Sequence, residues 1–225
     1  MTLETFDVLE PHILNIVFMS LLITNLYLLG SSRIGALIWT AGAQGALLAV
    51  LPLFPQVGEF SAHAILIAIG SGLIKGALIP WLLMFALKDA GVRRDVEPYV
   101  GFSLSLVIGV AFTAVSFWFA SKIAVGGQTA ASPFVSVAIS MALCGMYLIA
   151  SRKKALTQII GYLTLENGVY VFGVSLASKL PFVVEMGIFL DIFVLVFVAG
   201  IVVFKINSTF DKIESAVART GKEGV

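Results

Sequence analysis

Three ionisable residues lie near the middle of long apolar runs in this chain of 225 residues, namely Lys75, Glu166 and Asp191. A lysine or an aspartate at the centre of a bilayer costs on the order of 3 kcal/mol on insertion scales. Such side chains are therefore expected to face the interior of a helix bundle or bound water rather than lipid. An amine and a carboxylate held together change each other's proton affinity, so the three residues predict a proton-transfer path at the membrane midplane.

Four further polar residues are placed to support such a path. Tyr162, Glu166 and Tyr170 recur every four residues, which puts them on one face of a helix, and Asn167 follows Glu166 directly. Gln44 is central in an earlier apolar run. It can either continue the polar row or form a hydrogen bond between two helices.

A buried ion pair that only holds helices together is the alternative interpretation of the charges. Lys75 could pair with Glu166 or with Asp191 in this way. However, a buried pair is often no more stable than apolar packing of the same volume. Stability alone is therefore a poor reason for these charges, which favours a functional role over a structural one.

The surroundings of Lys75 allow two interpretations. Pro80 removes the hydrogen bond that would otherwise reach the carbonyl of Gly76, and glycines also stand at positions 70 and 72. These residues can make room for a kink and a water molecule beside Lys75. They can equally permit close packing of helices.

The sequence carries no pattern for catalysis or for metal binding. The lone cysteine, Cys144, can form no internal disulfide, and one thiolate cannot hold an iron–sulfur cluster or a structural zinc. No histidine pair at ligand spacing, phosphate loop or nucleophile elbow occurs. We therefore expect no catalytic residue, no metal ligand and no cofactor in this chain, bound lipids apart. Any electron-transfer chemistry would belong to another subunit.

Composition places these residues in a membrane protein. Hydrophobic residues make up 59% of the chain and charged residues 12%, against about 25% charged in ordinary soluble domains. A net charge of +1 excludes a nucleic-acid partner, which needs a concentrated basic surface. A helix needs roughly 20 apolar residues to cross the hydrocarbon core. By that measure the chain is all-α with seven transmembrane helices, at Ile13–Leu29, Ile34–Phe54, Ala62–Leu87, Tyr99–Ser121, Pro133–Ala150, Ala155–Ala177 and Phe182–Lys205.

The distribution of basic residues predicts the orientation of these helices. Eleven lysines and arginines fall in the first, third and fifth loops and the C-terminal end, whereas only Lys122 and Lys179 fall on the other side. Because basic loops stay in the cytoplasm, the N-terminus is expected outside and the C-terminus in the cytoplasm. The acidic first residues do not resemble a cleavable signal.

Four parts follow along the chain. They are an N-terminal three-helix unit (1–98), a linking fourth helix and loop (99–131), a second three-helix unit (132–205) and a cytoplasmic tail (206–225). The two units share one orientation, and Tyr27-Leu28-Leu29-Gly30-Ser31 resembles Tyr147-Leu148-Ile149-Ala150-Ser151. This suggests a parallel repeat of helices 1–3 and 5–7.

The second unit resembles a known family. Gly145-Met146-Tyr147-Leu148-Ile149, the basic turn Arg152-Lys153-Lys154, then Gly161, Glu166-Asn167 and Asp191 are similar to the K subunit of respiratory complex I and to the C subunit of Mrp-type sodium/proton antiporters. With four helices in front, the chain resembles the hydrogenase-4 component E family. Lys75-Gly-Ala-Leu-Ile-Pro80 resembles the lysine helix of that family.

The resemblance implies a non-catalytic subunit in the membrane arm of a group 4 nickel–iron (NiFe) hydrogenase, such as a formate hydrogenlyase-like complex, in the cell inner membrane. Its partners would be antiporter-like and quinone-site-type membrane subunits and a peripheral arm with the NiFe and iron–sulfur centres. Redox chemistry in those subunits would be coupled to ion translocation along Lys75, Glu166 and Asp191. A component of a multisubunit cation/proton antiporter and a purely structural scaffold subunit remain as alternatives.

Overall fold

The computed structural model describes residues 3–54, 62–89, 96, 98–122 and 133–176, and beyond them 192–193, 195–197 and 199–200. Within these ranges the chain is helical and contains no strand; Pro98 and Arg152 form one isolated bridge. The elements are α1 (Leu3–Gly30), α2 (Ile34–Ala49), η1 (Leu51–Leu53), α3 (Ala62–Ser71), η2 (Gly72–Leu78), α4 (Ile79–Asp89), α5 (Phe102–Ala120), α6 (Pro133–Ser151) and α7 (Ala155–Leu176).

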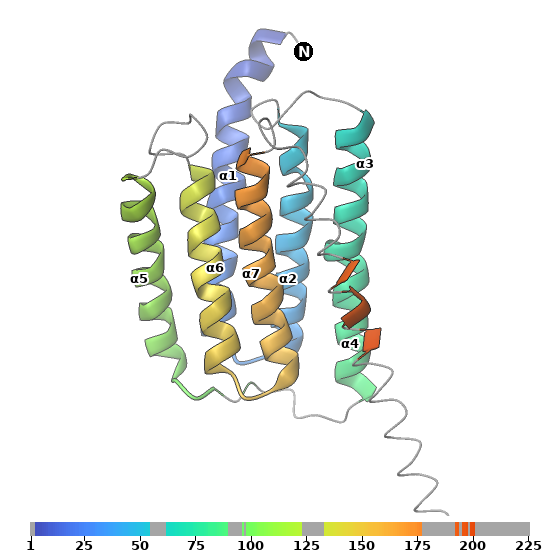
Figure 1. The fold of residues 1–225 in the computed structure, drawn as a ribbon, viewed down its shortest axis with the longest axis vertical. Coiled ribbons are helices and arrows are strands. Elements are labelled where there is room, and N and C mark those ends of the chain that lie inside the picture. Colours follow the sequence, from blue (N-terminus) through green and yellow to red (C-terminus); the bar gives the residue numbers. More distant parts are fainter. Residues whose placement is uncertain are drawn as a thin grey trace, which may run out of the picture.

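Five stretches of the described chain are long and apolar enough to cross a membrane. They are Pro11–Gly30, Ile34–Leu53, Ala68–Lys88, Phe102–Ala120 and Pro133–Ser151. The sixth predicted helix is present as α7, which runs alongside α6 and α2 (Figure 1). The seventh predicted helix, Phe182–Lys205, lies almost wholly outside the described residues. The count of seven, the repeat and the cytoplasmic tail therefore stay predictions.

Proline accounts for the early end of the second predicted helix. It does not account for the first, because α1 begins at Leu3 rather than at the predicted Ile13 and continues through Pro11. The second run was expected to continue to Phe54, but α2 ends at Ala49 and a 3₁₀ turn with Pro52 follows. A proline is tolerated in the first turn of a helix, not in its interior. The third run is continuous as expected, but it changes from α to π and back to α before Asp89.

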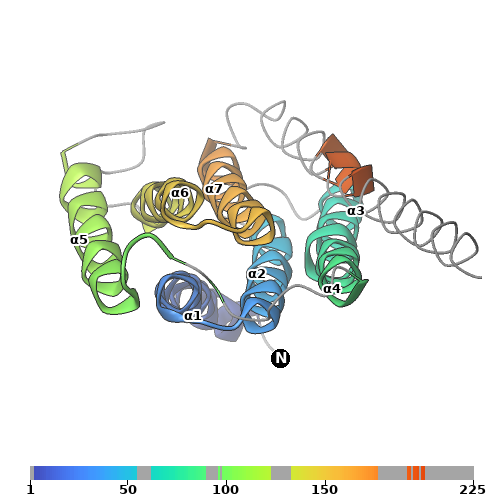
Figure 2. The same cartoon turned by 90° about the horizontal axis from the view of Figure 1, so that it is seen from below.

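The helices stand side by side and nearly parallel, with successive ones pointing in opposite directions (Figure 1). Seen along their axes, α5 lies at one edge and the α3–η2–α4 helix at the other, with α6, α7 and α2 between them and α1 packed below (Figure 2). The closest contact is the α6–α7 hairpin. A Cβ added at Gly145 of α6 would lie 2.7 Å from the carbonyl oxygen of Gly161 of α7, so glycines let these two backbones touch.

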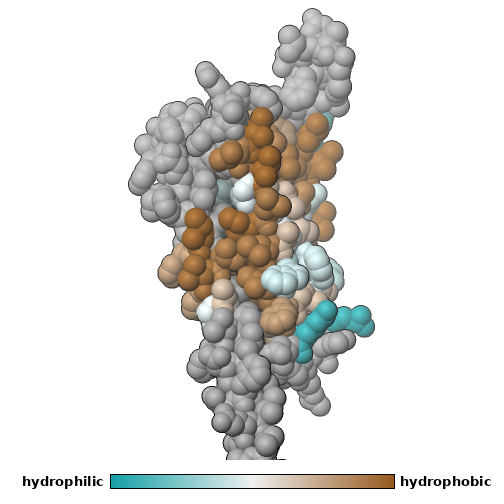
Figure 3. All heavy atoms as spheres, turned by 90° about the vertical axis from the view of Figure 1, so that its right-hand side faces the viewer, coloured by the Kyte–Doolittle hydropathy of each residue, from teal (hydrophilic) through white to brown (hydrophobic). Residues whose placement is uncertain are grey.

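The apolar residues divide between interior and outer surface as expected for a bundle in lipid. Buried clusters join α1, α2, α6 and α7 in the middle. The described surface over α3 and α4 is mostly hydrophobic (Figure 3), and it includes exposed Leu66, Leu73 and Trp81. Such a surface is costly in water and natural in a hydrocarbon solvent.

One end of the bundle carries most of the described basic residues near helix ends. Arg33, Lys88 and the basic turn Arg152-Lys153-Lys154 lie where α1, α4 and α6 end, at the bottom of Figure 1, whereas Lys122 follows α5 at the other end. Arg152 is not an exposed loop charge. It is fully buried, its Nη2 donates to the carbonyl of Leu29 at 2.6 Å, and its guanidinium lies 5.2 Å from the Phe102 ring. It therefore caps the C-terminal end of α1.

Candidate functional site

A π-helical stretch carries Lys75. Residues 72–78 form η2, directly before Pro80 in α4. Pro80 has no N–H to donate and its ring crowds the preceding turn, and a π-bulge is one way in which a helix accommodates such a break. The kink predicted beside Lys75 therefore takes the form of a local widening of the helix, of a kind frequent at functional sites.

Glycines on α2 let η2 approach closely. A Cβ added at Gly45 would lie 2.5 Å from Cβ of Lys75, and one added at Gly42 would lie 2.6 Å from Cγ of Pro80. On the other side of the contact, Gly76 faces Ala46 in the same manner. The glycines near Lys75 were expected to allow either a kink with a water molecule or close helix packing. Gly76 packs closely against Ala46, whereas nothing lies within 4 Å of a Cβ added at Gly70.

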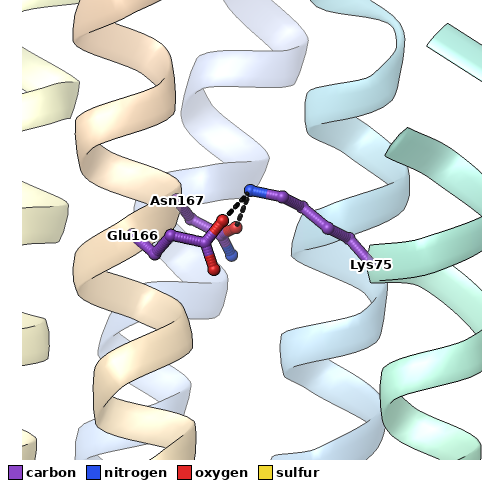
Figure 4. A network of polar contacts seen from close by, with 3 residues as sticks. All are labelled: Lys75, Glu166 and Asn167. Carbon is purple, nitrogen blue, oxygen red and sulfur yellow. Dashed lines mark hydrogen bonds and ion pairs between the residues drawn. The ribbon is translucent and has the colours of Figure 1, made fainter. Parts of the chain in front are cut away.

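Lys75 reaches past α2 to α7, where it forms a buried ion pair (Figure 4). Its Nζ lies 2.6 Å from Oε1 of Glu166, and the two side chains are 3% and 2% exposed. The ammonium also donates to Oδ1 of Asn167 at 3.4 Å and lies 4.8 Å from the ring centroid of Tyr170. We refer to Lys75, Glu166, Asn167 and Tyr170 as the charged cluster.

The charged cluster pairs an amine with a carboxylate, two groups whose chemistry includes binding and releasing a proton. A pair of opposite charges in a low-dielectric interior is strongly coupled, so the protonation of Glu166 and that of Lys75 depend on each other. Asn167 and Tyr170 supply further polar groups to the ammonium. The cluster thus joins one helix of the N-terminal unit to one helix of the C-terminal unit by a contact that a proton could rearrange.

The other predicted site residues lie elsewhere or outside the described residues. Gln44 is fully buried, and its Nε2 donates to Oγ1 of Thr24 on α1 at 3.2 Å. Tyr162 is half-buried and lines a cavity of about 320 Å³ with Ile159 and Phe193. Asp191 lies outside the described residues, so its relation to Lys75 stays a prediction.

Sequence reasoning missed a second set of buried polar contacts. Nδ2 of Asn25 on α1 donates to the carbonyl of Ser140 on α6 at 3.5 Å, and the Ser140 hydroxyl lies 3.0 Å from Oγ1 of Thr113 on α5. We refer to Thr24, Asn25, Gln44, Thr113 and Ser140 as the neutral seam. The sequence contained two signals. Gln44 was expected either to continue the polar row or to form a hydrogen bond between two helices, and it does bond to Thr24. Asn25 also stands inside the first apolar run, but an uncharged residue there is easy to overlook.

Among the described residues there is no group of three or more His, Cys, Asp or Glu side chains that could hold a metal ion. Cys144 is buried and free. The described geometry is therefore that of charged and neutral polar contacts between helices.

Comparison with known proteins gives distant relatives. An uncharacterized protein of Mycobacterium tuberculosis is 27% identical over 168 residues, which cover 74% of this chain and 76% of that protein. Hydrogenase-4 component E of Escherichia coli is 26% identical over 151 residues, which cover 67% of this chain and 70% of that protein, and the protein of the same name in Shigella flexneri matches equally. No family model and no solved structure matches.

Proposed function

We propose that this chain is a non-catalytic membrane subunit of a respiratory-type hydrogenase complex, and that its charged cluster takes part in proton transfer coupled to redox chemistry in other subunits. The observation that carries the proposal is the Lys75–Glu166 pair, held at 2.6 Å between two helices and almost wholly shielded from the surroundings. The distant similarity to hydrogenase-4 component E is the reason for proposing a hydrogenase complex as its setting.

A buried pair of this kind suits transfer better than stability. Its desolvation cost is comparable to its Coulomb attraction, so apolar residues would hold the helices as well. When a proton reaches Glu166, the attraction to Lys75 is lost and the ammonium becomes free to donate to another group. Asp191, in the seventh predicted helix, is the group that we propose next along this route.

The resemblance supplies the proposed setting. The chain would span the inner membrane with seven helices, the N-terminus outside, and the end with Arg33, Lys88 and the basic turn in the cytoplasm, because basic ends remain on that side. Its proposed partners are antiporter-like and quinone-site-type membrane subunits and a peripheral arm with the NiFe and iron–sulfur centres. A reporter fused to either terminus tests the orientation.

The proposed function is tested by separating electron transfer from proton transfer in native membranes. Glu166→Gln keeps the size of the side chain but removes its titration. We expect assembly of the complex and its redox activity to persist, while the redox-driven pH gradient, followed with a fluorescent dye, is lost. Thr164→Val is the matched control, since this buried hydroxyl on the same helix donates to the carbonyl of Ile160.

Three results would contradict the proposal. A full pH gradient in both Glu166→Gln and Lys75→Met would leave a structural scaffold subunit as the remaining interpretation. Copurification with antiporter subunits and without a hydrogenase arm would favour the cation/proton antiporter. A pH gradient lost equally in Thr164→Val would show that helix α7, rather than its carboxylate, is what matters.

A further inference from the structure

The neutral seam contains two buried acceptors that lack a hydrogen-bond donor among the described residues. They are Oε1 of Gln44 and Oδ1 of Asn25, on side chains that are 0% and 1% exposed. More than nine in ten buried polar groups in proteins have a partner, either a protein group or an ordered water. Two exceptions on adjoining helices therefore need an explanation.

The hydrogen bonds fix which atom of each amide is the unpaired one. The Thr24 hydroxyl donates to the carbonyl of Ser20 at 2.8 Å, so it must accept from Gln44. The Ser140 carbonyl can only accept, so Asn25 must present its nitrogen there. In both residues the amide oxygen is left over. What both positions lack is the same, namely an O–H or N–H donor.

The rest of the neutral seam extends the polar interior towards α5. The Thr113 hydroxyl donates to the carbonyl of Gly109 at 3.0 Å, so Ser140 is the donor in the contact between the two hydroxyls. The hydrogen bond therefore runs from the hydroxyl of Ser140 on α6, as donor, to that of Thr113 on α5, as acceptor. The Asn25–Ser140 contact of 3.5 Å is longer than an ordinary hydrogen bond, so it satisfies these two groups only weakly.

The two polar regions are neighbours in the bundle. Gln44 of the neutral seam precedes Gly45, whose Cα rests against Lys75 of the charged cluster. Helix α2 also contacts α7, which carries Glu166. Helix α2 therefore borders both polar regions.

We propose that ordered water molecules occupy the neutral seam, donating to Oε1 of Gln44 and Oδ1 of Asn25. This hydrated seam continues the polar interior from the charged cluster, through α2, α1 and α6, to Thr113 on the edge helix α5. A water molecule needs two to four polar partners to be bound inside a protein, and the amide oxygens together with the hydroxyls of Thr24, Ser140 and Thr113 supply them. That protons use the neutral seam rests on the proposed function. That the neutral seam is hydrated does not.

Cys144 provides a built-in probe of this water. The thiol is fully buried, one turn after Ser140 on α6, and the side chains of Asn25 and Ser140 lie beside it. Met141, one turn earlier on α6, is equally buried in an apolar cluster with Phe18 and Phe134, whereas Cys144 borders both an apolar cluster and the side chains of the neutral seam. Hydroxyl radicals made from water by X-rays modify side chains next to bound water, so the two sulfur atoms report a wet and a dry site in one protein.

The experiment is radiolytic footprinting of the full-length protein in lipid nanodiscs, read by mass spectrometry. Each modification rate is divided by the rate of the same residue in the denatured chain. We expect Cys144 to be modified well above Met141. In Asn25→Leu, which removes an acceptor, Cys144 should fall to the level of Met141. Ser116→Ala should leave the ratio unchanged, because this fully buried hydroxyl donates to the Phe112 carbonyl of its own helix.

Equal protection of Cys144 and Met141 in the unmodified protein would overturn the proposal, and this comparison needs no variant to fold. A ratio that Asn25→Leu leaves intact would overturn it as well. Footprinting reads hydration and not proton movement. A dry seam together with a pH gradient abolished by Glu166→Gln would therefore reject only this inference, whereas a wet seam with an intact gradient would reject only the proposed function.

Discussion

The charged cluster and the neutral seam both connect helices through buried polar side chains, but the chemical groups that they use differ. Both place polar side chains between helices, away from solvent, and both join helices that are far apart in the sequence. The charged cluster does so with full charges, a π-helical stretch and a glycine contact at Gly45. The neutral seam does so with amides and hydroxyls on regular α-helices. The difference is in the backbone that presents the ammonium, because Lys75 stands on a π-helical stretch whereas the side chains of the neutral seam stand on regular α-helices.

Removing one member of the ion pair should have the largest effect. Lys75→Met leaves the Glu166 carboxylate without its ammonium in a buried position, which costs about 3–5 kcal/mol when a buried pair is broken from one side. The double variant Lys75→Met/Glu166→Leu should regain most of that loss, because no uncompensated charge remains. Chemical unfolding of the purified protein in micelles measures both, and a double variant as unstable as the single one would contradict this account.

A methyl group at Gly45 should come next. A Cβ there would lie 2.5 Å from Lys75 Cβ and 2.9 Å from its carbonyl oxygen, so η2 must move away from α2. Overpacking of this kind costs about 1–3 kcal/mol, and the displaced ammonium should also impair redox-driven proton transfer. Gly70→Ala is the matched control, because nothing lies within 4 Å of the added Cβ. If both variants behave alike, the close contact does not shape the site.

A substitution at Arg152, a buried charge outside both regions, should have an intermediate effect. It tests whether any buried charge, or only the charged cluster, matters for proton transfer. Arg152→Lys keeps the charge but loses the planar fork that reaches the Leu29 carbonyl and stacks near Phe102. We expect a loss of about 1–3 kcal/mol with proton transfer unaffected.

The loss caused by removing the charge of Arg152 altogether should be independent of pH. Burial lowers the pKa of Arg152, and the stability gained from a lowered pKa of a base appears only as the pH rises towards that pKa. An arginine remains charged in proteins at any ordinary pH. Arg152→Gln and the unmodified protein should therefore differ by the same free energy of unfolding at about pH 6 and at about pH 8. Lys153→Gln, at an exposed neighbour, is the control.

The smallest effect should come from the neutral seam. Ser140→Ala removes a hydroxyl that bonds between two helices, worth about 1 kcal/mol. Ser116→Ala, whose hydroxyl bonds only within its own helix, should change the free energy of unfolding by less than about 0.5 kcal/mol. Paired unfolding measurements test this, and equal values would mean that the Ser140–Thr113 contact adds nothing to the bundle.

The sequence determined which segments become helices and which residues are exceptional. Apolar runs predicted six helices that the described structure contains, and the cost of charge in lipid singled out Lys75 and Glu166 before any geometry was known. Both signals are local in the chain. Hydropathy is summed over about one helix length, and a charge in such a run is conspicuous by itself.

Only the tertiary structure decided the partners. Glu166 and Asp191 were both open choices for Lys75, and the described structure brings Glu166 to it. The contact of Gly45 with Lys75 and the Asn25, Ser140 and Thr113 part of the neutral seam could not be predicted, because each depends on which faces of separate helices meet. Serine, threonine and asparagine cost little in an apolar run, since they bond to their own backbone. Their side chains acquire a role only when another helix is brought within hydrogen-bonding distance.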